Sequence, residues 1–132
     1  MEDMIQYIKN DRFAAFIGIK LVNVEPGYAL VQLEITDNHL NGVNMVQGGV
    51  IFTLADYAFA AASNSKSLTV GINVNITYYR SPQGKILTAE ATEITSNKKI
   101  CGYNVDVFDE NKDLVARFCG TGYIKRPPDA NI

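Results

Sequence analysis

Asp56 and the glycine pair Gly48-Gly49 are the residues whose types and spacing most suggest chemistry. They belong to one stretch, QGGVIFTLADYAFAAASN from Gln47 to Asn64, in which Asp56 is the one charged residue. Burying an ionised carboxylate is costly unless charges or hydrogen bonds compensate, so Asp56 is a candidate base or nucleophile. The alternative is a residue at the edge of a helix, exposed or hydrogen-bonded to nearby backbone, and the spacing alone favours neither.

The alanine-rich composition of this stretch predicts a helix from Gly49 to Ser63, since strong helix formers dominate and no proline interrupts them. Apolar side chains occupy most of the helix circumference, which is typical of a core element, so we expect Asp56 to be at least partly removed from water. The free N–H groups of the first turn form an end that binds anions and suits a developing oxyanion.

Helix geometry separates these two features. At ~1.5 Å of rise per residue, Asp56 lies roughly 12 Å along the axis from Gly48, so one copy cannot bring both to the same carbonyl group. Two antiparallel copies of the helix could. If the two groups share a reaction, the sequence predicts a homodimer with sites at the interface, and a homotetramer built from two such dimers is the further expectation.

The bulk composition is that of an ordinary globular protein. With 132 residues, 47% hydrophobic and 20% charged, the chain is expected to form one domain over residues 1–132. A net charge of −2 argues against a nucleic-acid partner. No segment has the pattern of a leader or a membrane span, so we expect a cytoplasmic protein without a membrane partner.

The chain has only two cysteines and one histidine, too few for most metal sites. Cys101 and Cys119 fall in separate predicted strands without metal-ligand spacing, so free and partly buried thiols are expected. The single histidine, His39, lies in a polar loop. We therefore expect no metal site.

The remaining elements are predicted to be strands around the helix. A short amphipathic helix near the start should end at Asn10, followed by extended chain from Phe13 to Ile17, and the tail from Arg126 should be loose. Strict alternation from Val70 to Tyr78 marks the clearest strand. Several antiparallel strands and one apolar helix favour an α+β fold in which the sheet wraps the helix. The predicted strands are 17–24, 29–35, 69–79, 86–95, 100–108 and 114–125.

These residues resemble the signature of a known family, the hotdog-fold acyl-CoA thioesterases of the phenylacetic-acid-degradation (PaaI-like) type in the 4-hydroxybenzoyl-CoA thioesterase superfamily. Asn41, Gln47-Gly48-Gly49 and Leu54-Ala55-Asp56 match its N…HGG…LxD pattern, and the segment from Tyr78 to Gly84 resembles its Y-x-R-P…G turn. The resemblance covers nearly the whole chain. It implies a hotdog fold, an antiparallel sheet of about six strands wrapped around one long central helix.

The resemblance also implies roles for particular residues. Asp56 would be the base or nucleophile, the Gly48 N–H the oxyanion donor, and Asn41 a side chain that orients the thioester. Gln47 stands where the family has histidine; because glutamine cannot titrate, we expect it to position groups by hydrogen bonding.

Coenzyme A would enter as part of an acyl-CoA substrate, with no separate cofactor required. Its phosphates need local cations and turn N–H groups. The candidates are all turn residues, namely Arg80, Ser81, Pro82, Gly84, Lys98 and Lys99. An acyl pocket would draw on Phe52, Tyr57 and Phe59, although core packing explains these aromatics equally well.

Two other functions stay open on the sequence. A non-catalytic acyl-CoA-binding hotdog domain would account for the missing family histidine. A hotdog hydratase or dehydratase would need a catalytic histidine, for which only His39 is available, and a lone loop histidine is more often simply exposed.

Overall fold

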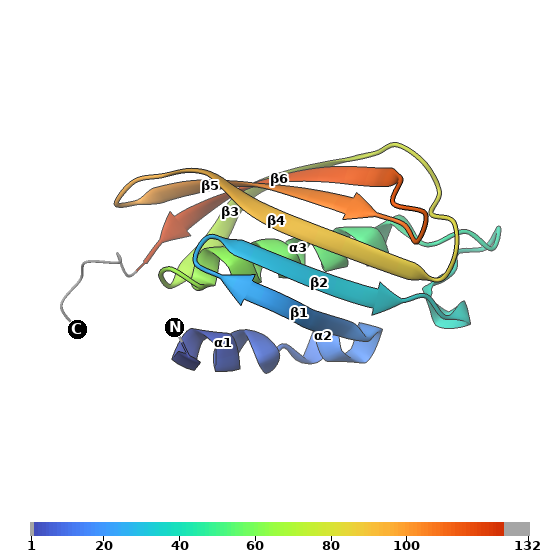
Figure 1. Ribbon diagram of the computed structural model, residues 1–132, viewed down its shortest axis with the longest axis horizontal. Coiled ribbons are helices and arrows are strands. Elements are labelled where there is room, and N and C mark those ends of the chain that lie inside the picture. The colour runs from blue at the N-terminus through green and yellow to red at the C-terminus, as the bar shows by residue number, and fades with distance from the viewer. Residues whose placement is uncertain (1, 126–132) are drawn as a thin grey trace.

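A computed structural model describes residues 2–125 and shows a six-stranded antiparallel sheet wrapped around a long helix (Figure 1). The strand order is β1-β2-β4-β5-β6-β3. This is the predicted hotdog architecture, and the α+β assignment is confirmed. The predicted loose tail from Arg126 lies outside the described residues. The strands are β1 (Ile19–Glu25), β2 (Tyr28–Glu34), β3 (Thr69–Tyr78), β4 (Ile86–Ser96), β5 (Ile100–Phe108) and β6 (Leu114–Ile124).

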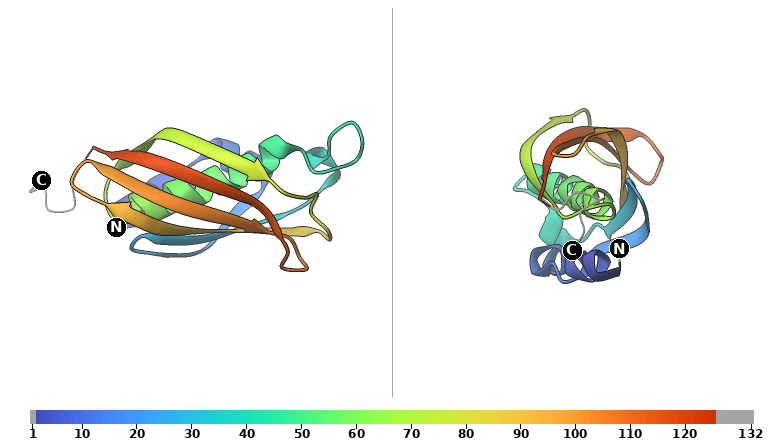
Figure 2. Two further views of the ribbon diagram at one scale, coloured as in Figure 1. Left: turned by 90° about the horizontal axis from the view of Figure 1, so that it is seen from above. Right: turned by 90° about the vertical axis from the view of Figure 1, so that its left-hand side faces the viewer.

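The central helix α3 (Gly48–Asn64) confirms the predicted core helix. Seen end-on in Figure 2, the sheet curves around it. Leu54, Ala55 and Ala58 have no solvent exposure, and they pack against an inner sheet face that includes Val105 and Phe118. The small alanine side chains let the sheet approach the helix closely, and the larger sheet residues fill the space between them.

The expectation that α3 is buried on all sides is wrong along one narrow stripe. Gly49 and Asp56 are exposed, and Thr53 and Ala60 are half-buried. Residues at these spacings lie on one helix face. The sheet leaves this face uncovered because it is open, with β1 and β3 as its two edges. We call Gly49, Thr53, Asp56 and Ala60 the α3 stripe.

Two short helices precede the sheet, α1 (Glu2–Lys9) and α2 (Arg12–Ile17), and α2 corrects the predicted extended chain at Phe13 to Ile17. The Asp11 carboxylate caps α2 by accepting a hydrogen bond from the Ala14 N–H at 3.0 Å. Gly18 ends the helix at φ 99°, a left-handed conformation that glycine adopts without strain. Both helices contact α3 (Figure 2), and the Tyr57 hydroxyl donates to the Ile8 carbonyl oxygen at 3.4 Å.

Strand β3 departs from the strict alternation predicted for it. Val74 and Ile76 are half-buried opposite Gly120 and Phe118 of β6, as expected for the inner face. The register shifts between Gly71 and Asn73, so Gly71 lies over the Phe59 ring, and a Cβ on it would be 3.1 Å from that ring. A bulge of this kind inserts one residue and moves the earlier side chains to the other face.

The two cysteines lie in strands of the sheet. Cys101 is buried and Cys119 half-buried, and both are free, which confirms the prediction. Within residues 2–125, no helix is both long enough and apolar enough to cross a membrane.

Candidate active site

Among residues 2–125, the start of α3 presents one backbone N–H without a protein acceptor. Gln47 is the N-cap: its side-chain oxygen accepts from the Gly49 N–H at 2.6 Å, and its carbonyl oxygen accepts from the Val50 N–H at 2.9 Å and the Ile51 N–H at 3.4 Å. Within residues 2–125 the Gly48 N–H has no acceptor. Since helix N-termini carry partial positive charge, Gly48 offers a preformed donor for an anionic oxygen.

Tyr78 fixes the position of this donor from the edge strand. Its hydroxyl donates to the Gly48 carbonyl oxygen at 3.0 Å, and a Cβ on Gly48 would be 3.4 Å from its ring. Partial burial raises the pKa of the Tyr78 phenol, so it remains a neutral donor. A Cβ at position 48 would therefore make an ordinary van der Waals contact with the Tyr78 ring.

A hollow of about 290 Å³ connects Gly48 with the turn after β3. We call it the Arg80 hollow; its walls include Met45, Val46, Gly48, Tyr78, Arg80 and Pro82. Ser81 also lines it. Three of the predicted coenzyme A-binding residues thus lie beside the predicted oxyanion donor, although 32 or more residues separate them from it in sequence.

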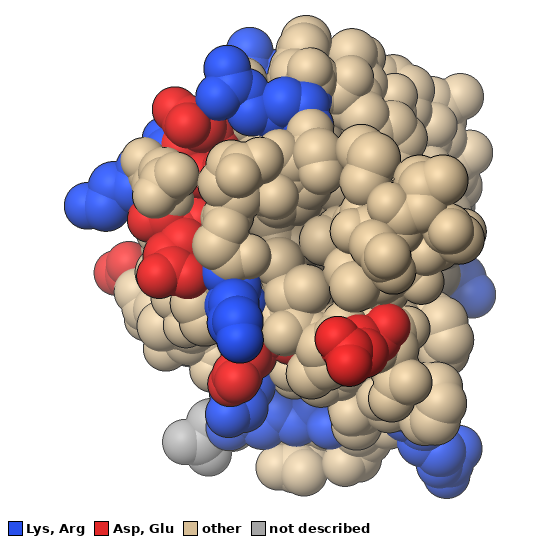
Figure 3. All heavy atoms as spheres, turned by 90° about the vertical axis from the view of Figure 1, so that its right-hand side faces the viewer, with Lys and Arg blue, Asp and Glu red and all other residues tan. Residues whose placement is uncertain are grey.

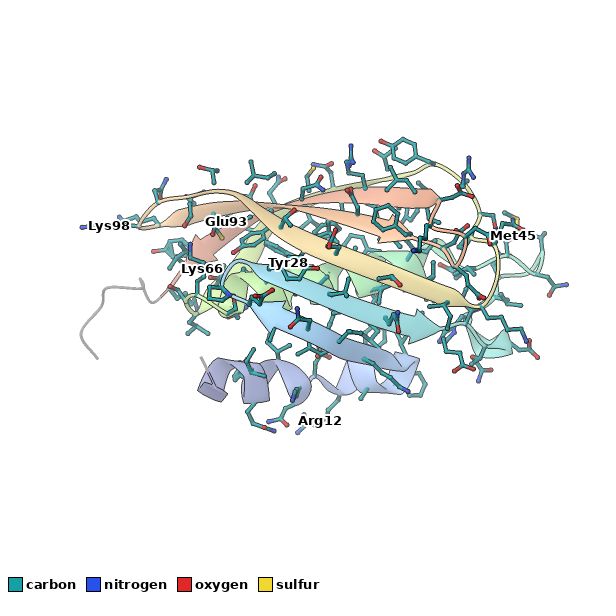
Figure 4. All side chains as sticks on the ribbon, viewed as in Figure 1. Arg12, Tyr28, Met45, Lys66, Glu93 and Lys98 are labelled. Carbon is teal, nitrogen blue, oxygen red and sulfur yellow. The ribbon has the colours of Figure 1, made fainter. Side chains whose placement is uncertain are left out.

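The other predicted coenzyme A contacts lie elsewhere. Gly84 packs under Glu110, and Lys98 is in the β4–β5 turn with Lys99, at the opposite end of the protomer from Met45 (Figure 4). Arg80 itself forms an ion pair with Asp113 at 3.1 Å. Figure 3 shows the end of the molecule that carries Met45. Its surface mixes Lys and Arg with Asp and Glu and is not uniformly positive.

Asp56 lies on the α3 stripe and is exposed on the single protomer, where partial burial was expected. The surroundings still desolvate the carboxyl group and raise its pKa, and the negative charge of Asp11 raises it further. Asp11 comes from the start of α2, so the N-terminal helices influence the charge state of Asp56. The sequence contains two signals for helix α2, an aspartate that can cap it before an apolar run and a glycine after that run. The sequence-based prediction used neither signal.

Asn41 makes structural contacts within its own loop. Its side-chain oxygen accepts from the Val43 N–H at 2.9 Å and the Met45 N–H at 3.1 Å. It thus shapes the loop before α3, in which Asn44 adopts a φ of 62°. The oxygen is occupied by the loop, so only the amide NH₂ remains for a substrate.

His39 is buried, although a lone histidine in a polar loop was expected to be exposed. Its Nδ1 accepts from the Thr36 N–H at 2.9 Å, and its Nε2 lies 2.7 Å from the Ile17 carbonyl oxygen. With Nδ1 as the acceptor, Nε2 carries the proton and donates it to that oxygen. Both ring nitrogens are committed to backbone, so His39 joins the loop to α2 and is not available to a substrate.

The aromatic residues expected to line an acyl pocket are core residues. Tyr57 and Phe59 are buried, and Phe59 packs on Tyr103 and Phe118 with ring centroids 5.7 and 5.9 Å apart. Phe52 meets Phe118 edge-on at 5.6 Å. These contacts support the core-packing alternative for Tyr57 and Phe59, and Phe52 is half-buried against the same core.

The sheet wrapped around α3 is the hotdog fold, and comparison with known proteins identifies the class. Residues 43–116 match the model of the thioesterase superfamily. The chain belongs to this superfamily and is a thioester hydrolase.

Individual relatives give the same result. The acyl-coenzyme A thioesterase PaaI of Escherichia coli K12 is 32% identical over 87% of this chain and 84% of its own length. The solved structure of the E. coli PaaI protein superposes with a TM-score of 0.87 at 29% identity, covering 92% of this chain and 90% of that one. The Streptococcus mutans protein smu.793, solved bound to acetyl CoA, has a TM-score of 0.79 at 25% identity, covering 85% and 92%.

Proposed function

We propose that this protein hydrolyses acyl-CoA thioesters, with the Gly48 N–H binding the carbonyl oxygen and Asp56 of a second copy acting as base or nucleophile. The observation that supports this most directly is the unpaired Gly48 N–H at the start of a helix whose next N–H groups are all satisfied by Gln47. The names of the relatives, an acyl-CoA thioesterase and a protein bound to acetyl CoA, favour coenzyme A as the thiol of the substrate.

The spacing within α3 requires the second copy. Asp56 lies roughly 12 Å along the axis from Gly48, which is too far for both groups to act on one carbonyl. The α3 stripe consists mostly of small residues, so a second α3 could pack on it antiparallel, with its Asp56 opposite the Gly48 turn. Within residues 2–125, strand β3 pairs only with β6 and leaves a free edge at which two sheets could join.

The proposed reaction uses each group at a defined atom. Asp56 takes a proton from a water molecule whose oxygen attacks the carbonyl carbon, and the Gly48 N–H stabilises the negative charge that develops on the carbonyl oxygen. The C–S bond then breaks, and the coenzyme A thiolate leaves and is protonated. A raised Asp56 pKa makes the carboxylate a stronger base.

Asp56 could also attack the carbonyl carbon itself. That route forms a mixed anhydride, which water then hydrolyses at either carbonyl. After a single turnover in ¹⁸O-water, label in the Asp56 carboxylate would demonstrate the anhydride route with attack at the Asp56 carbonyl, because direct hydrolysis places ¹⁸O only in the released acid.

Arg80, Ser81 and Pro82 are the proposed contacts for coenzyme A, since they line the hollow that reaches Gly48. An arginine with neighbouring turn N–H groups is suited to phosphate oxygens. Gly84, Lys98 and Lys99 lie apart from this hollow in the protomer and are left out of the proposed site.

The test is release of free thiol from aryl- and medium-chain acyl-CoAs. We expect wild-type turnover, a loss of about 10²–10⁴-fold in kcat for Asp56→Asn, and unchanged turnover for Glu34→Gln, which removes an exposed carboxylate outside the site. Equal rates for Asp56→Asn and wild type would contradict the role of Asp56. An absence of thiol release by wild type would contradict the proposed function.

A further inference from the structure

A second hollow lies on the other side of the start of α3. Its volume is about 330 Å³, close to that of the Arg80 hollow. Gly48 lines the Arg80 hollow, and its neighbours Gln47 and Gly49 line this one. We call it the Phe13 hollow; its other walls include Phe13, Ile17, Leu40, Val50 and Thr53.

The two hollows differ in chemistry. The Arg80 hollow contains a guanidinium and a serine hydroxyl beside two tyrosines and several aliphatic side chains. The Phe13 hollow has an aromatic ring, three aliphatic side chains from three different segments, the amides of Asn38 and Gln47, and no charged residue. The Thr53 hydroxyl is already bonded to the Gly49 carbonyl oxygen at 2.7 Å. Phe13 is 60% exposed. Covering such a ring with an apolar ligand is favourable because the apolar surface leaves water.

A thioester bound at Gly48 has two arms that leave the carbonyl carbon in different directions. The coenzyme A arm carries phosphates and suits the Arg80 hollow. We infer that the Phe13 hollow receives the acyl group, and that Phe13 and Ile17 of α2 determine which acyl groups fit. This inference rests on the proposed function. A volume of about 330 Å³ is near the small end of ligand pockets, which span about 300–1,000 Å³, so the substrate class is an aryl or medium-chain acyl group.

A third hollow offers the alternative location. It lies at the far end of the α3 stripe, has a volume of about 580 Å³, and is lined by Tyr7, Asp11, Arg12, Ala60 and Asn64 among others. Its charged side chains, Asp11 and Arg12, make it a poorer environment for an apolar group than the Phe13 hollow, which has no charged residue, since charged groups would lose water without gaining partners. Tyr7 is 71% exposed and, like Phe13, is an aromatic residue of the N-terminal helices, so it provides a matched control.

The test compares kcat/KM across a series of acyl-CoAs, from acetyl to decanoyl with benzoyl and phenylacetyl, for wild type, Phe13→Ala, Phe13→Leu and Tyr7→Ala. We expect Phe13→Ala to lower kcat/KM for the aryl esters about 10-fold and to shift the optimum to longer chains, because removing the ring enlarges the hollow. The two-carbon acetyl group fills the least of the hollow, so acetyl-CoA turnover should change least across the series. Phe13→Leu should give a smaller shift, and Tyr7→Ala none.

The outcomes separate this inference from the function on which it rests. An unchanged acyl profile in both Phe13 variants, or a shift in Tyr7→Ala in their place, overturns the inference while wild-type turnover upholds the proposed function. No thiol release by wild type from any ester overturns both. A Phe13→Ala protein that loses acetyl-CoA turnover together with its far-UV circular dichroism would be misfolded, and the Phe13→Leu profile then decides the result.

Discussion

Asp56 occupies the stripe of α3 that the protomer leaves uncovered. The same surroundings that desolvate it also raise its pKa, so its charged form is less favourable in the folded protein than in the unfolded chain. A group of this kind destabilises the fold once the pH rises above its unfolded pKa. Keeping a carboxylate here is consistent with a residue retained for chemistry at some expense in stability.

Asp11 provides a way to change the Asp56 pKa without removing Asp56. Asp11→Asn removes a negative charge but keeps an N-cap, since asparagine caps helices as well as aspartate does. Losing that charge lowers the Asp56 pKa. We therefore expect the acid limb of the kcat/KM profile to move to lower pH, with a modest fall in the plateau because the base is weaker.

The measurement is a pH–rate profile with one aryl-CoA ester, with Asp37→Asn as the control for removing an exposed carboxylate elsewhere. Identical acid limbs in Asp11→Asn and wild type would show that Asp56 does not titrate in this limb, or that Asp11 does not influence it in the working enzyme.

At the residue scale, the sequence suggested candidate groups but not how they are held. The carboxylate at position 56 and the glycine at position 48 were identified from a single charge in an apolar helix and from the helix start. The capping role of Gln47 and the Tyr78 contact depend on contacts between segments, which one-dimensional spacing does not contain.

At the element scale, Asp109 joins the connection between β3 and β4 to the turn between β5 and β6. Its buried carboxylate accepts from the N–H groups of Gln83 at 3.0 Å, Asn111 at 2.9 Å and Asp113 at 3.1 Å. Burial alone would raise the Asp109 pKa, but these donors and the nearby Arg80 charge hold it below its usual range. Asp109 therefore positions the turn that carries Arg80.

We expect Asp109→Asn to lower the free energy of unfolding by about 1–3 kcal/mol at neutral pH. Because the Asp109 pKa is depressed in the fold, its contribution is present above the unfolded pKa and is lost as the pH falls through the folded pKa. Urea unfolding at several pH values should therefore show a difference between variant and wild type that narrows on acidification. A difference independent of pH would argue against the charge of Asp109 as the cause.

Strands were more predictable than their irregularities. Alternating apolar residues gave all six strands because half-buried strands repeat every two residues. The β3 bulge was missed, since inserting one residue leaves the apolar pattern almost unchanged. Helix α2 was also missed: its six residues are too short for a clear helical period, and its two caps were the only usable signals.

At the scale of the whole molecule, a shared site predicts complementation between inactive chains. Gly48→Pro removes the donor N–H at the first helical position, where proline is well tolerated. Gln47 already has the extended conformation that proline requires of the preceding residue, with φ −63° and ψ 132°. We expect this variant and Asp56→Asn to fold and to be inactive alone.

A mixed dimer of these two chains regains activity if Gly48 and Asp56 act across the interface. In a two-fold dimer, one site then combines the intact Gly48 of one chain with the intact Asp56 of the other, and the second site carries both changes. Dimers purified through two different tags, one on each chain, should therefore release thiol at about half the wild-type rate per dimer, one of the two sites being intact.

The reciprocal pairing identifies the arrangement. When wild type is paired with a chain that carries both substitutions, each interface site contains one intact and one altered group, so these dimers should be inactive. If instead both groups of one site came from the same chain, the wild-type chain would keep a complete site and this pairing would be the active one. Activity in the reciprocal pairing and none in the first would therefore overturn the antiparallel arrangement of α3, whereas the opposite pattern follows only if the second copy supplies Asp56.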